Sequence, residues 1–96
     1  MRSVVAAVIG IASIAAAIVA SAEPPAGAAA CSGCHPSSAR ASSPVARLAG
    51  RDRPEIVKAM HEFRSGERAA TVMDRIAKGF TDAEIEAIAA WFAQQR

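Results

Sequence analysis

Apolar residues recur every three to four positions in two segments of the chain, residues 54–66 and 82–95. That spacing places the apolar side chains on one face of a helix and leaves the polar residues facing water. No segment alternates between apolar and polar residues with period two, so no β-strand is predicted. The expected buried positions are Ile56, Met60 and Phe63 in the first segment and Ile85, Ile88, Ala89 and Phe92 in the second.

The ends of both helices are also marked in the sequence. Pro54 suits the first turn of a helix because its fixed φ is already helical, and Gly66 is a typical residue just past a helix end. Thr81, followed three residues later by Glu84, forms the capping box of a helix start.

Three further segments complete the predicted architecture. Residues 26–34 are rich in alanine and indicate a short helix, and residues 71–78 indicate one or two more helical turns. Residues 36–53 contain Ser, Pro and Gly without periodicity, which predicts a loop. A loop of this length is unusual in a small domain, so we expect it to wrap around something. The sequence therefore predicts an all-α fold with three to four short helices.

The beginning of the chain has the pattern of a targeting segment. A positive Arg2 precedes an apolar stretch over residues 4–20, and Ala20-Ser21-Ala22 is the small-x-small pattern of a signal peptidase site. We expect residues 1–22 to be a secretory signal peptide and residues 23–96 to form one domain in the periplasm. The alternative is an uncleaved membrane anchor, for which the apolar stretch is at the short end.

Charge and size limit what the mature domain can do. Loss of Arg2 leaves ten of the eleven Lys and Arg against nine Asp and Glu, a net charge of +1. This balance argues against nucleic-acid binding. So short a chain buries little apolar surface and needs a disulfide, metal or cofactor as reinforcement. We expect the protein without its cofactor to be largely unfolded.

Both cysteines lie in one motif, Cys31-Ser32-Gly33-Cys34-His35. A disulfide between residues so close would constrain the unfolded chain little. A redox dithiol of the thioredoxin type needs a βαβ surround, which the pattern lacks. A structural zinc site needs four ligands, and His61 is the one remaining histidine. The spacing CxxCH is that of covalent haem attachment, and a secreted chain favours this interpretation.

Haem attachment gives each residue of the motif a role. The thiols of Cys31 and Cys34 would each add across one vinyl group of a single haem c, and His35 would be an axial ligand of the iron. Met73, in a short helical segment between loops, is our candidate for the second axial ligand. Met60 is interpreted as a core residue and His61 as a solvated helix residue. An open distal site, suited to sensing or peroxidase chemistry, is the alternative to ligation by Met73.

The sequence as a whole resembles a known family. The CxxCH motif, LAGR at residues 48–51, FRSGER at 63–68 and TVMDRIAKGFTDAEIEAIAAWF at 71–92 are similar to class I c-type cytochromes. The likeness extends to the cytochrome subunit of flavocytochrome c sulfide dehydrogenase. It implies a small class I cytochrome c fold around one covalent haem. It also implies that Trp91 and Phe92 pack the last helix on the first, where Gly27 allows close approach.

Two positions depart from the family pattern. Pro36 follows the CxxCH histidine where members often have Gly, and Ala46 stands where many have a proline before the LAG leucine. A main-chain carbonyl in this loop is expected to accept a hydrogen bond from the second ring nitrogen of the histidine. Pro44 is the candidate residue for that carbonyl.

The resemblance implies that the protein transfers electrons and is not itself an enzyme. It implies a sulfide-oxidising flavoprotein with FAD as the partner. We expect no binding to nucleic acid and, after cleavage of the signal peptide, no attachment to the membrane. No catalytic base or nucleophile is evident. The alternative is a free-standing soluble periplasmic electron shuttle.

A sequence cluster of basic residues is interpreted as ordinary solvated helix surface rather than a docking rim. Its members are Arg64, Arg68, Arg75 and Lys78.

Overall fold

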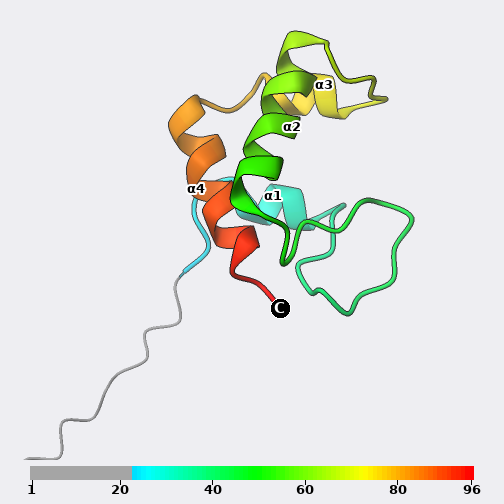
Figure 1. The fold of residues 1–96 in the computed structure, drawn as a ribbon, viewed down its shortest axis with the longest axis vertical. Coiled ribbons are helices and arrows are strands. Elements are labelled where there is room, and N and C mark those ends of the chain that lie inside the picture. The colour runs from blue at the N-terminus through cyan, green and yellow to red at the C-terminus, as the bar shows by residue number, and fades with distance from the viewer. Residues whose placement is uncertain (1–22) are drawn as a thin grey trace, which may run out of the picture.

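The computed structural model describes residues 23–96, and the expected signal peptide lies outside these residues. Within them the chain forms α1 (Ala28–Ser32), α2 (Arg53–Ser65), α3 (Met73–Ala77) and α4 (Asp82–Ala93). In Figure 1, α2 runs through the middle, α4 lies on one side of it, and the long loop and α3 project on the other. The prediction of an all-α fold is confirmed for the described residues. No helix among residues 23–96 is long and apolar enough to cross a membrane.

The helix ends agree with the sequence pattern. Helix α2 has Pro54 in its first turn and is closed by Gly66 at φ 84°. The capping box of α4 is present in both directions: Glu84 N donates to Thr81 Oγ1 at 3.2 Å, and Thr81 N donates to Glu84 Oε1 at 3.0 Å. Helices α1 and α3 have five residues each and are shorter than their sequence segments predicted.

The core consists of two neighbouring apolar clusters. Helix α4 supplies residues to both, and its predicted inward face is confirmed. Val57 and Phe80 pack against both clusters and so join them. The first cluster comprises Ala28, Ile56, Ile88, Ala89 and Phe92, and the second comprises Met60, Ala77 and Ile85. Met60 is 8% exposed, as expected of a core residue.

Gly27 allows the chain before α1 to lie close to α4 and to the segment that precedes it. Its φ is +90°, and a Cβ at this position would lie 2.5 Å from Phe80 Cε1 and 3.1 Å from Ile88 Cδ1. A side chain is therefore excluded both by the backbone conformation and by space. The expected close approach at Gly27 is confirmed, with Phe80 as an additional neighbour that the sequence did not reveal.

The long loop is fixed to the end of α4 by the LAG motif. Ala49 is fully buried, and Leu48 packs against the first core cluster. Gly50, at φ +74°, donates its N–H to the carbonyl of Phe92 at 3.0 Å. Arg47 Nη1 donates to the carbonyl of Ala39 at 2.8 Å and ties the loop to itself. The loop therefore has a defined path even though it contains no regular structure.

Candidate functional site

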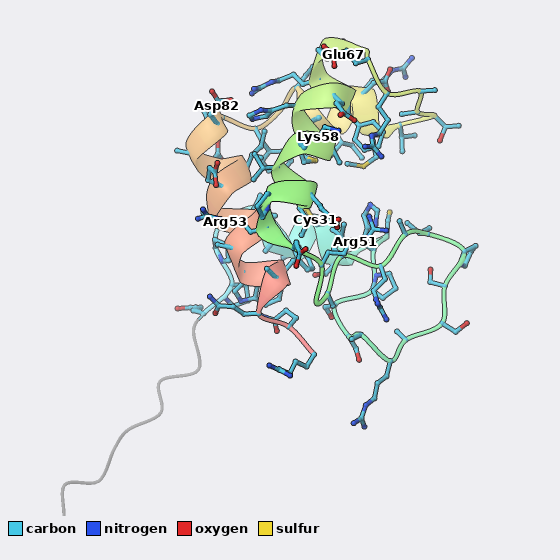
Figure 2. All side chains as sticks on the ribbon, viewed as in Figure 1. Cys31, Arg51, Arg53, Lys58, Glu67 and Asp82 are labelled. Atoms are coloured by element: carbon cyan, nitrogen blue, oxygen red, sulfur yellow. The ribbon has the colours of Figure 1, made fainter. Side chains whose placement is uncertain are left out.

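The CxxCH motif lies where α1 ends. Cys31 is in the last turn of α1, and the chain then turns tightly because the amides of Cys34 and His35 both donate to the carbonyl of Cys31, at 3.2 and 2.8 Å. The two cysteines do not form a disulfide, and Cys34 is exposed while Cys31 is partly covered. Figure 2 shows Cys31 close to the place where the long loop returns toward α2. The turn thus presents both thiols and the imidazole from one short segment.

The local environment does not activate the Cys31 thiol as a nucleophile. Burial raises the pKa of Cys31, and a backbone hydrogen bond offsets this only in part. Cys31 also lies near the end of α1 rather than at its positive beginning, where a helix would stabilise a thiolate. The environment of Cys31 is therefore unlike that of a reactive dithiol.

His35 is oriented by a carbonyl group of the long loop. Its Nδ1 lies 2.5 Å from the carbonyl oxygen of Ala46. Because a carbonyl can only accept, Nδ1 has a proton, and in the neutral imidazole the lone pair is then on Nε2. This is the tautomer that a metal-ligating histidine adopts when its other nitrogen is held by the protein.

The carbonyl that holds His35 belongs to Ala46, so the assignment to Pro44 was wrong. Ala46 lies two residues before Leu48, which is packed against the core, whereas Pro44 is in an exposed bend. The anchored part of the loop is the part that can hold a ring in place. Ala46 is also the position at which the sequence departs from the family pattern, and only its main chain is needed here.

Met73 is the first residue of α3 and packs, partly buried, against the second core cluster. Its neighbours Val72 and Ile76 are 55% and 41% exposed. Val45, adjacent to the carbonyl that holds His35, is 37% exposed. Among the described residues these are the three large apolar side chains that are exposed, and all lie beside a candidate ligand segment. Each of the three leaves apolar surface in water that a porphyrin held by these segments would cover.

No zinc site is formed by the described residues. No group of three or more His, Cys, Asp and Glu side chains is placed to hold a metal ion between residues 23 and 96. His61 is on α2, 44% exposed at its side chain, with Nε2 at 3.6 Å from Asp82 Oδ1. The expectation of a solvated helix histidine at this position is confirmed.

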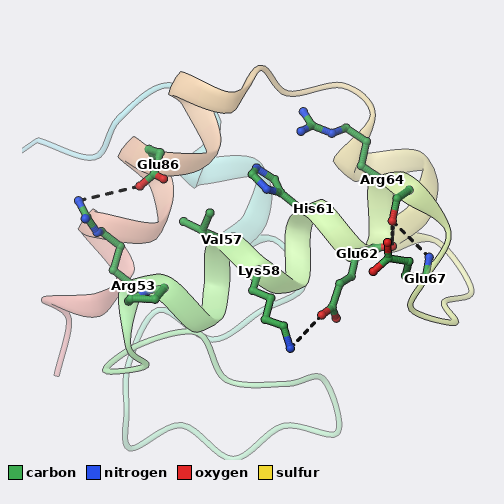
Figure 3. Close-up of a pocket in the computed structure, with 10 residues that line it drawn as sticks. Arg53, Val57, Lys58, His61, Glu62, Arg64, Glu67 and Glu86 are labelled. Carbon is green, nitrogen blue, oxygen red and sulfur yellow. Dashed lines mark hydrogen bonds and ion pairs between the residues drawn. The ribbon is translucent and has the colours of Figure 1, made fainter.

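The basic cluster near Met73 is partly neutralised. Arg64 Nη2 pairs with Asp82 Oδ1 at 2.5 Å, and Arg68 Nη2 pairs with Glu62 Oε2 at 2.7 Å. For these two arginines the interpretation as ordinary helix surface is confirmed. A groove along α2, drawn in Figure 3, is lined by similarly paired charges, among them Arg53 with Glu86. It contains none of the candidate site residues.

Comparison with known proteins agrees with this geometry. The chain is 40% identical over 62 residues to the cytochrome subunit of sulfide dehydrogenase from Chlorobaculum tepidum, a match that covers 65% of this chain and 56% of that protein. It is 36% identical over 64 residues to cytochrome c-552 from Acidithiobacillus ferridurans, covering 67% of this chain and 28% of that protein. Over these matched regions the chain is therefore similar to two cytochromes. No family model matches it.

The relationship with cytochromes extends over part of each relative, because the matched region spans about half of the first and about a quarter of the second. The roles of Cys31, Cys34, His35 and Met73 in the candidate site stay predictions from the sequence. Sequence reasoning missed Ala46 and Phe80, which act through the main chain and through packing between helices. Their roles depend on contacts distant in sequence, for which periodicity gives no indication.

Proposed function

We propose that this chain is a haem c electron-transfer protein. Cys31 and Cys34 form the two thioethers to one haem, and His35 and Met73 are the axial ligands of its iron. The observation that supports this best is the hydrogen bond between His35 Nδ1 and the Ala46 carbonyl, which leaves Nε2 available as a ligand. Haem held by these residues would supply one-electron chemistry between Fe(III) and Fe(II), and the polypeptide would adjust the potential at which this happens.

The protein would contribute in two ways: it would position the ligands of the haem iron, and it would exclude water from the haem. The loop holds the imidazole of His35 in one orientation, and its hydrogen bond makes the ring a stronger donor. The exposed apolar side chains of Val45, Val72 and Ile76 supply a surface that a porphyrin would cover. Such cover would remove these side chains from water and stabilise the fold by the hydrophobic effect.

We propose further that the protein acts in the periplasm as the cytochrome subunit of a sulfide-oxidising flavoprotein with FAD. The relative of Chlorobaculum tepidum, named as the cytochrome subunit of sulfide dehydrogenase, supports this assignment. A free-standing periplasmic carrier is the second candidate, and the match to a cytochrome c-552, whose name mentions no flavoprotein, favours it. In both roles the chain transfers electrons and the substrate chemistry belongs to its partner.

Axial ligation is tested with two matched variants, Met73→Leu and Met60→Leu. Both replace a thioether by a side chain of similar volume. If Met73 is the ligand, Met73→Leu loses the far-red absorption band of the oxidised protein and has a lower reduction potential, because a thioether favours Fe(II). Met60→Leu keeps both. An unchanged spectrum in Met73→Leu would indicate an open distal site and contradict the assignment.

The partner is tested by purifying the secreted protein from its native host. A flavin-containing polypeptide that co-elutes with the haem absorbance through gel filtration supports the subunit role. Elution of the cytochrome alone, at the size of a monomer and without flavin, supports the free carrier and contradicts the subunit role.

A further inference from the structure

Charged residues are distributed unevenly along the chain. Glu23 and the eight acidic residues between positions 52 and 86 account for all nine carboxylates. Residues 24–51 and 87–96 contain none, yet they contain four arginines. The four are Arg40, Arg47, Arg51 and Arg96. A near-neutral domain therefore has one part whose charged side chains are all arginines.

The fold brings three of these arginines together. The long loop and the end of α4 form a groove of about 730 Å³, with Arg40, Arg47 and Arg96 among its lining residues. No acidic residue lines it. The remaining lining residues are small or uncharged: Ala39, Ala49, Gly50, Ala93, Gln94 and Gln95. We call this the arginine groove.

The arginines of the groove are not neutralised by the protein. None of them takes part in an ion pair among residues 23–96, and residues 1–22 contain no Asp or Glu. On the rest of the described surface, by contrast, Arg53, Lys58, Arg64 and Arg68 each pair with a carboxylate. Six cations have no ion pair among residues 23–96, and the arginine groove gathers three of them; the other three are Arg51, Arg75 and Lys78. The groove is therefore a local site of positive potential.

The groove is also held in shape. Arg47 Nη1 donates to the Ala39 carbonyl at 2.8 Å, and Gly50 N donates to the Phe92 carbonyl at 3.0 Å. Gln95, another lining residue, is held as well, because its Nε2 donates to the Trp91 carbonyl at 2.9 Å. Small side chains at Ala49 and Gly50 leave room for another main chain to approach. Binding here would require little reorganisation.

We propose that the arginine groove docks an acidic segment of a partner protein. Guanidinium groups recognise carboxylates in paired hydrogen bonds, which suits Asp and Glu side chains. The groove has no aromatic side chain on which a base could stack, and no large exposed apolar side chain to enter a membrane. Protein is therefore the class of partner that the surface fits.

The position of the groove connects docking with the candidate redox site. Arg47 is adjacent in sequence to Ala46, whose carbonyl holds His35. A partner seated on the groove therefore contacts the segment that orients the proposed iron ligand. That the partner is a redox protein rests on the proposed function, whereas the groove and its charge do not depend on it.

The test measures binding of a fluorescently labelled oligoglutamate peptide to the purified secreted holoprotein at low ionic strength. The variant Arg40→Gln with Arg96→Gln removes two groove charges and breaks no side-chain hydrogen bond of the described structure. The control, Arg75→Gln with Lys78→Gln, removes two exposed charges near Met73 instead. We expect the groove variant to weaken binding about fivefold and the control by less than about twofold. Arg40→Lys keeps the charge but loses the planar group that pairs with a carboxylate, so we expect it to bind more weakly than the wild type and more tightly than Arg40→Gln.

Equal weakening by both double variants would indicate unspecific attraction and overturn the proposal, as would no measurable binding by the wild type. Tighter binding of anionic phospholipid vesicles or an oligonucleotide than of the peptide, with the same sensitivity to Arg40 and Arg96, would assign the groove to a different partner class. The haem absorbance of each preparation is recorded separately. A protein without haem that still binds the peptide would refute the proposed function and leave the docking surface standing.

Discussion

The imidazole of His35 donates a hydrogen bond to the main-chain carbonyl of Ala46, 2.5 Å away and eleven residues further along the chain. This contact joins the CxxCH turn to the long loop. The loop is itself held at Gly50, whose N–H donates to the Phe92 carbonyl of α4. The orientation of His35 therefore depends on how firmly the loop is fixed to the last helix.

Substitution of Gly50 by alanine tests this dependence. Gly50 has φ +74°, and its Cβ would lie 3.4 Å from the Gln95 carbonyl, so the cost is mainly conformational, about 1–2 kcal/mol. Movement of the loop would weaken the bond from Ala46 to His35 and make the imidazole a poorer donor. We expect lower stability in urea unfolding and, in the holoprotein, a higher reduction potential.

Gly66→Ala is the matched control for the loop. Gly66 has φ +84° with nothing within 4 Å of its Cβ, so it suffers the same backbone strain far from His35 in sequence. We expect a similar loss of stability and an unchanged potential. If both variants leave the potential at the wild-type value, the loop does not control the electronic character of His35.

Gly27→Ala should be more damaging than either of these. It combines a positive φ with a Cβ only 2.5 Å from the ring of Phe80, and Phe80 packs against both core clusters. We expect a loss of about 2–4 kcal/mol in the free energy of unfolding, measured with urea. A loss no larger than that of Gly66→Ala would mean that the Phe80 ring moves aside without cost.

The pair formed by Arg64 and Asp82 predicts part of the acid sensitivity of the fold. Arg64, by a hydrogen bond and then by its charge, lowers the pKa of Asp82 from its ordinary value of 3.8. A carboxylate whose pKa is lower in the folded state stabilises the protein above its unfolded pKa. That contribution is lost as the pH falls below about 4 through the depressed value.

Asp82→Asn should therefore be less stable than the wild type at neutral pH and should lose less stability on acidification. Urea unfolding at neutral and acid pH measures both effects. Arg64→Gln is expected to act in the same way, and the double variant should add little, because both remove one interaction. An Asp82→Asn protein with the full acid sensitivity of the wild type would assign that sensitivity to other carboxylates.

The small core predicts that the haem is part of the fold. Only nine apolar residues of the described chain are buried, and four of these nine are alanines, one each from α1, α3, α4 and the loop. We expect the variant Cys31→Ala with Cys34→Ala to give little helical signal in far-UV circular dichroism. A domain this small buries too little apolar surface to be stable without haem. A helical apoprotein that melts cooperatively would contradict this expectation.

Much of the fold could be predicted because it depends on neighbours in sequence. The capping box of Thr81 and Glu84 and the helix end at Gly66 are local patterns, and both are present. The buried face of α4 follows from helical spacing alone. The same locality explains why the CxxCH motif could be recognised before the structure was described.

The remaining features depend on contacts that no local pattern encodes. Phe80 lies between two helices, outside any periodic segment, and its packing appears only when α2, α3 and α4 are assembled. In the long loop, Ala46 rather than Pro44 meets His35 because Leu48 fixes the nearby main chain. The pairing of Arg64 with Asp82 likewise joins residues eighteen positions apart. Loops without periodicity give the sequence little with which to predict such contacts.

Intact-mass spectrometry of the secreted protein under denaturing conditions tests whether haem is attached covalently through Cys31 and Cys34. We expect the denatured polypeptide to retain the added mass of one haem, and the variant Cys31→Ala with Cys34→Ala to have the mass of the bare polypeptide. A wild-type protein that is produced in a host able to attach haem c and still has only the polypeptide mass would contradict covalent attachment.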